Sequence, residues 1–194
     1  MPEAAFVDIV PGKRDLQWLN VVAVVLFGVG LVAGVVLTVV RGPVDIAVGL
    51  VDVLVVTVLC VVVIVVHELT HGLVMLLLGE RPRFGFVRMA GSVPAFFATP
   101  ARPVRFTRGQ YLTIALAPLV VVNLVTAGLV LVAPVGWWFV LPLALHLSGC
   151  VGDLWATRQA LAQPAGASFE DLRDGLRVFP PPAGAPGPAR DRPC

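Results

Sequence analysis

The stretch "VLVVTVLCVVVIVVHELTHGLVMLLLG", residues 53–79, is the most informative part of the sequence. It is apolar over far more than the 18 residues that mark a candidate transmembrane helix. Three ionisable side chains, His67, Glu68 and His71, nevertheless stand close together within it. Ionisable groups inside a membrane are costly and usually serve a function. We therefore treat this cluster as the candidate site and ask what the rest of the chain builds around it.

The composition indicates a membrane protein. Of the 194 residues, 58% are hydrophobic and only 13% are charged, against about 25% charged in ordinary soluble domains. Such a chain cannot cover its surface with polar groups, so we expect the bilayer to be its solvent. The three cysteines suggest no disulfide framework, and the first residues do not read as a cleavable signal peptide. Nothing in the sequence points to nucleic-acid binding.

Four membrane spans are expected, at about 16–40, 47–78, 110–132 and 137–161. As one helix the second would be about 48 Å long, so it must tilt, kink or begin outside the membrane. Gly79 suits the position after a helix, and Thr107 with Gln110 has the spacing of a capping box before the third span. Trp137 and Trp138 suit the water–lipid interface.

The predicted fold class is an all-α membrane protein with four transmembrane helices. The stretch "RFGFVRM", residues 83–89, alternates as a strand does, so a short β-hairpin could form in the loop between helices 2 and 3. The same segment could instead rest on anionic headgroups through its arginines. We expect a single domain over 1–163, followed by a proline-rich, largely disordered tail over 164–194, in which "GLRVF" could form a strand.

The basic residues predict the orientation. With four spans, the N-terminus, the loop between spans 2 and 3 and the tail share one side of the membrane. That side holds every Lys and Arg except Arg41. Cytoplasmic segments carry the excess of basic residues, so both termini are predicted to be cytoplasmic.

The cluster has the spacing of a zinc-dependent hydrolase. On a helix, His67 and His71 project from one face and can bind one zinc ion. Glu68 would then act as general base on the zinc-bound water. The alternative is a polar cluster that only holds helices together and has no catalytic role.

A catalytic zinc site needs a third protein ligand. In the apolar runs the candidates are Asp153, His146 and Cys150, all in the fourth span. Asp153 lies about two helical turns from the end of its span, and the motif histidines lie two to three turns from the end of theirs. We rank Asp153 first, His146 second and Cys150 third. His146 could alternatively donate a hydrogen bond to the oxyanion of a tetrahedral intermediate.

Three motifs together resemble a known family. "HELTHG", then "LAPLVVVNL" at residues 116–124, then "GCVGDL" at 149–154 resemble the site-2-protease group of intramembrane zinc metallopeptidases, and especially its branch of small bacterial and archaeal zincin peptidases. The resemblance implies that His67, His71 and Asp153 bind Zn²⁺ and that Glu68 is the general base. It also implies a supporting catalytic role for Asn123, and a prokaryotic cell membrane as the location.

The expected function is therefore a membrane-embedded zinc metallopeptidase that cleaves peptide bonds in or next to transmembrane segments. Its partners would be the lipid bilayer and a membrane protein or peptide as substrate, and the oligomeric state stays open. Two alternatives use the same residues: a zinc-binding transporter or sensor, and a catalytically inactive regulatory scaffold. Glu68 beside His67 favours the enzyme, because a transporter needs ligands spread along a path.

Overall fold

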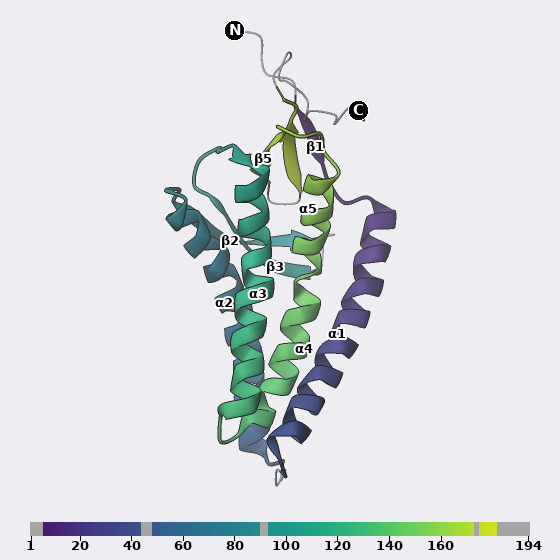
Figure 1. Cartoon of the computed structure of the whole chain (residues 1–194), viewed down its shortest axis with the longest axis vertical. Helices are drawn as coiled ribbons and strands as arrows, with labels where there is room; N and C mark the ends of the chain where they lie inside the picture. Colours follow the sequence, from purple (N-terminus) through teal and green to yellow (C-terminus); the bar gives the residue numbers. More distant parts are fainter. Residues whose placement is uncertain (1–5, 44–47, 90–92, 173–174, 182–194) are drawn as a thin grey trace, which may run out of the picture.

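Four apolar helical segments form a bundle, with small antiparallel sheets packed beside one half of it (Figure 1). The computed structural model describes residues 6–43, 48–89, 93–172 and 175–181. The segments are α1 (Lys13–Arg41), α2 (Leu50–Leu77), α3 (Arg108–Val132) and a composite fourth segment, Gly136–Leu161. The predicted fold class is confirmed.

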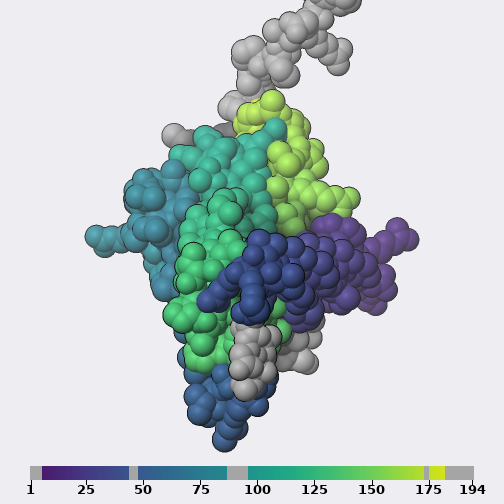
Figure 2. Space-filling model, turned by 60° about the horizontal axis from the view of Figure 1, so that its bottom comes forward, coloured from purple at the N-terminus to yellow at the C-terminus, as the bar shows by residue number. Residues whose placement is uncertain are grey.

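All four segments are long and apolar enough to cross a membrane. In the most apolar part of α2 only 6% of the residues are buried inside the protein, and in α1 only 11%. Figure 2 shows α1, in purple and dark blue, on the outside of the bundle. Helices this apolar and this exposed need a hydrocarbon solvent, as the composition predicts.

The fourth segment is bent, whereas the sequence predicts one helix over 137–161. It consists of a short 3-10 helix (η1, Gly136–Phe139), α4 (Val140–Gly149) and α5 (Val151–Leu161). Cys150 joins α4 to α5 with ψ near 1°, far from the helical value of about −42°. The preceding Ser148–Gly149 pair is a common cause of such kinks.

Two glycines allow α1 and α4 to pack closely. A Cβ atom added to Gly30 would lie 2.6 Å from the Cα of Ala144, and one added to Gly34 would lie 2.8 Å from Val140. Small residues four apart are a common device for helix contacts in membranes, where no hydrophobic force drives helices together. This packing holds α4, which carries His146, in a fixed place.

A β-hairpin lies between α2 and α3, as the sequence predicts. Strands β2 (Pro82–Met89) and β3 (Val93–Pro100) pair in antiparallel register, with Phe84 opposite Ala98. The hairpin comes close to the motif helix because Gly72 has no side chain: a Cβ there would lie 2.5 Å from the Phe84 ring. Gly72 therefore lets the hairpin pack against the turn that carries His71.

A second sheet packs at one end of the bundle (Figure 1). Its order is β1 (Val7–Ile9), β6 (Leu176–Phe179), β5 (Ser168–Asp171) and β4 (Phe106–Thr107), all antiparallel. Phe106, Phe169 and Leu176 are almost fully buried in one cluster with Met75 and Trp155 of the helices. The "GLRVF" segment forms the expected strand. The sequence predicts a disordered tail over residues 168–171, but these residues form strand β5. They are ordered because Phe169 and its neighbours bury apolar side chains against the helix ends.

Hydrogen bonds fix the helix ends at both sides of the bundle. The predicted capping box is present, since the Thr107 side chain accepts from the Gln110 amide and the Gln110 side chain accepts from the Thr107 amide. At the opposite end, the Trp138 indole donates to Asp52 over 2.9 Å. Gly79 has φ of 85° just beyond α2, as expected of a glycine that ends a helix.

Replacing Gly30 by valine should destabilise the protein by about 1–3 kcal/mol, because the new side chain overlaps the backbone of α4. Thermal unfolding of the purified protein in detergent measures the effect. Gly28→Val is the matched control, since a Cβ at Gly28 meets no atom within 4 Å. Equal melting temperatures for the two variants would contradict the close α1–α4 contact.

Candidate metal centre

The motif residues of α2 face Asp153 of α5. The Nε2 atoms of His67 and His71 lie 3.1 Å apart. Asp153 approaches both, with Oδ2 at 3.3 Å from Nε2 of His67 and Oδ1 at 3.4 Å from Nε2 of His71. The three side chains are between 10% and 17% exposed. Three potential metal ligands therefore converge from two helices in a largely buried position.

The opposite nitrogen of His71 is held by α3. Nδ1 of His71 lies 2.8 Å from the carbonyl oxygen of Ile114, which can only accept a hydrogen bond. This carbonyl is available because the residue four positions later is Pro118, which has no amide to donate back along the helix. His71 therefore carries a proton on Nδ1, and in the neutral ring Nε2 presents a lone pair to Asp153.

Local hydrogen bonding leaves the convergent atoms without donors. Asp153 Oδ2 is buried and has no hydrogen-bond partner. A neutral His71 offers only a lone pair at Nε2, and an ionised Asp153 offers only lone pairs. Buried acceptors this close to one another repel unless a cation lies between them. The donor set thus fits a metal ion.

The spacing also fits zinc. Zinc bonds to histidine nitrogen and carboxylate oxygen are about 2.0–2.2 Å long, so tetrahedral ligand atoms should lie about 3.3–3.5 Å apart. The two histidine nitrogens lie 3.1 Å apart, and they lie 3.3 Å and 3.4 Å from different oxygens of Asp153. Three protein ligands would leave the fourth tetrahedral position open, which is the pattern of catalytic rather than structural zinc sites.

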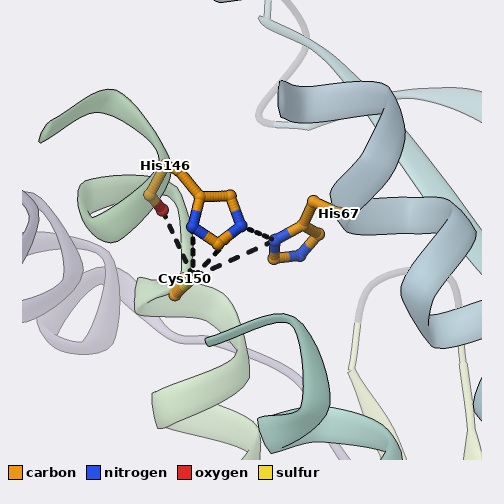
Figure 3. A group of neighbouring side chains, drawn as sticks. All are labelled: His67, His146 and Cys150. Carbon is orange, nitrogen blue, oxygen red and sulfur yellow. Dashed lines mark hydrogen bonds between the residues drawn. The ribbon is translucent and has the colours of Figure 1, made fainter. Parts of the chain in front are cut away.

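A second group of potential ligands lies behind His67 (Figure 3). Nδ1 of His67 is 3.1 Å from Nε2 of His146, and the Cys150 sulfur lies 3.8–3.9 Å from the nearest ring nitrogens of both histidines. Nδ1 of His146 in turn lies 3.1 Å from Oδ1 of Asn123. His146, Cys150 and Asn123 therefore face the side of His67 that points away from Asp153.

A cavity of about 230 Å³ adjoins the convergent atoms. Glu68, His71 and Asp153 line it together with Asp171. Ala98 of β3 lines the same cavity as Glu68. Much of the remaining wall is apolar or aromatic, contributed by residues including Leu19, Met75, Phe96, Phe106, Tyr111 and Trp155. The cavity is thus a pocket with carboxylates and histidine at one side and apolar walls around them.

The structure brings together more than the sequence identifies. Glu68 and the three predicted zinc ligands lie in one place, whereas His146 contacts His67 and Asn123 contacts His146. Sequence reasoning missed Asp171, because it lies in a segment predicted as tail. It also missed the partner of His71, although a proline inside an apolar helix is a readable signal of a free carbonyl.

Asp171 should make stability pH-dependent in the metal-free protein. Burial raises the pKa of its carboxyl to about 7, aided by the charges of Asp153 and Glu68. The value in an unfolded chain is about 3.9, so the folded state binds this proton more tightly. The carboxylate therefore costs stability increasingly as pH rises from about 4 to about 7.

Asp171→Asn should relieve this cost, with a gain in stability about 2 kcal/mol larger at pH 8 than at pH 5. Denaturation of the metal-free protein in detergent at the two pH values measures it. Glu170→Gln, one position earlier on β5, is the matched control for the loss of a carboxylate from this strand. A gain for Asp171→Asn that is the same at pH 5 and pH 8 would refute the assignment.

Comparison with known families agrees with this site. A family model described as "putative zincin peptidase" matches residues 59–168, a range that includes the motif of α2, the hairpin, α3 and Asp153. No curated protein and no solved structure matches the chain. Because the matched range covers more than half of the 194 residues, the chain belongs to this family of putative zincin peptidases.

Proposed function

We propose that the protein is a membrane-embedded zinc metalloendopeptidase of the HExxH type, akin to the site-2-protease group, that cleaves peptide bonds in or next to transmembrane segments. The observation that carries the proposal is the convergence of His67, His71 and Asp153 beside Glu68, within a bundle of four apolar helices. Membership of the zincin family supports it.

Each residue of the centre has a distinct task. His67, His71 and Asp153 hold the ion, and zinc supplies Lewis-acid catalysis when bound. Glu68 takes a proton from the attacking water and passes it to the leaving amine. The carboxylates and His71 make one side of the cavity polar, so that water can enter it.

The substrate is proposed to lie in an extended conformation along β3. A hydrogen-bonded helix hides its peptide carbonyls, so a transmembrane substrate must unwind locally before it is cut. Phe96, Ala98 and Thr99 of β3 line the cavity that holds Glu68. A peptide added beside this strand would bring its carbonyls next to the centre, as in other cases of strand addition.

The proposed orientation places the centre in the cytoplasmic half of a prokaryotic cell membrane, with both termini cytoplasmic. The basic residues support it: Arg41 lies at one end of the bundle, and the other basic residues among those that the structure describes lie at the end that carries the two sheets. Alkaline phosphatase fused after residue 194 should stay inactive in a bacterial host, because it needs export to fold. An active fusion would overturn this orientation.

Glu68→Gln should bind zinc as tightly as the wild type and lose peptide hydrolysis by about 10²–10⁴-fold, the usual contribution of a general base. The assay uses protein in detergent with a panel of transmembrane peptides, and measures bound zinc alongside cleavage. Glu80→Gln is the matched control, since Glu80 pairs with Arg102 outside the cavity.

Equal rates of peptide cleavage by wild type and Glu68→Gln would contradict the peptidase mechanism. Tight zinc binding by a wild type that cleaves no peptide in the panel would instead favour a zinc transporter, a sensor or an inactive scaffold.

A further inference from the structure

We propose that α3 fixes the tautomers of both zinc-binding histidines, and that Asn123 and His146 are positioning residues for His67 and not zinc ligands. The inference rests on the proposed metal centre and adds the hydrogen bonds that orient it. Histidines that bind metals commonly donate their other ring N–H to an acceptor, which fixes the tautomer and the orientation of the ring.

Asn123 determines which atom donates in the hydrogen bond between Asn123 and His146. Its Nδ2 donates to the carbonyl of Leu119 over 2.7 Å, which leaves Oδ1 as the atom facing His146. An amide oxygen only accepts, so Nδ1 of His146 must donate the hydrogen bond of 3.1 Å. A neutral His146 then has an unprotonated Nε2.

His146 in turn determines which atom donates in the hydrogen bond between His146 and His67. The unprotonated Nε2 of His146 accepts over 3.1 Å, and Nδ1 of His67 must be the donor (Figure 3). A neutral His67 protonated on Nδ1 keeps its lone pair on Nε2, which is the atom that faces His71 and Asp153. The hydrogen bonds from His67 to His146 and from His146 to Asn123 therefore leave the Nε2 atom of His67 unprotonated, so that this atom can bind a metal.

A single hydrogen bond fixes the same tautomer in His71. His71 donates from Nδ1 to the Ile114 carbonyl, which Pro118 leaves without a helical donor. Ile114, Pro118 and Asn123 all belong to α3. One helix that contributes no zinc ligand thus sets the protonation pattern of both histidines.

A metal ion bound between His67, His146 and Cys150 is the competing interpretation. Tetrahedral zinc would place nitrogen and sulfur ligands about 3.5–3.6 Å apart, and the nearest separations are 3.8–3.9 Å. Because this difference is as small as the one at the His67–His71 pair, other contacts must decide between the two groups. The Cys150 thiol already donates to the His146 carbonyl over 3.2 Å. Zinc at this position would also remove the proton from Nδ1 of His67. The observed contacts fit hydrogen bonds better than ligation.

The test measures zinc affinity in a Glu68→Gln background, so that the result does not depend on peptide cleavage. Purified full-length protein in detergent competes with a chromophoric chelator for zinc, and the Co²⁺-loaded protein gives a d–d spectrum that reports ligand geometry. Thermal unfolding confirms that each variant is folded.

Asn123→Leu and His146→Leu should each weaken zinc binding by about 10–100-fold and alter the Co²⁺ spectrum. His146→Gln should recover most of the affinity, because its amide oxygen can still accept from Nδ1 of His67. Pro118→Ala should also weaken binding, since the new amide competes for the Ile114 carbonyl. Thr126→Val is the control on α3, because Thr126 bonds only within its own helix at Val122.

Three outcomes would overturn the proposal. Unchanged affinity in Asn123→Leu and His146→Leu would show that the hydrogen bonds do not matter. Two zinc ions per wild-type chain, one of them lost in Cys150→Ala, would assign the second group as a metal site. Loss of zinc in both His146→Leu and His146→Gln, with binding retained in Asp153→Asn, would make His146 the third ligand. Absence of zinc binding by the wild type would remove the proposed function as well.

Discussion

One electrostatic constraint governs the site: acceptor atoms of three side chains, His67, His71 and Asp153, lie 3.1–3.4 Å from one another inside an apolar bundle. In water such atoms would be hydrated, and in a low-dielectric surrounding they repel one another unless a cation separates them. In their neutral forms His67 and His71 place no proton between these atoms, since each ring carries its N–H at the opposite nitrogen. The arrangement is therefore pre-organised for a positive ion.

The surrounding elements serve to hold this arrangement. Gly30 and Gly34 let α1 approach α4, which carries His146, and the bend at Cys150 separates His146 from Asp153 on consecutive helices. The absence of a side chain at Gly72 brings the hairpin against the motif turn, so that β3 borders the cavity. The four-stranded sheet closes the same end through Phe106, Phe169 and Leu176. Most of the polar chemistry thus lies at the half of the bundle that the sheets cover.

Much of this was readable along the chain because it depends on local periodicity. The four spans follow from runs of apolar residues, the hairpin from alternation, the start of α3 from the Thr107–Gln110 capping pair, and the shared face of His67 and His71 from their spacing. Depth in the membrane also singled out Asp153. By contrast, the inclusion of residues 168–171 in a sheet and the presence of Asp171 in the cavity have no local signature.

The four helices long and apolar enough to span a membrane, and the zinc-type motif, follow from the sequence alone, because hydrophobicity and helical spacing are properties of neighbouring residues. Which nitrogen of each ring meets which partner is known only from the packing of the helices. From the sequence, His146 could be a ligand, an oxyanion donor or a positioning residue. Its contacts with His67 and Asn123 show the direction of its two hydrogen bonds. Such directions depend on how separate helices are rotated and packed, and no spacing within one helix encodes them.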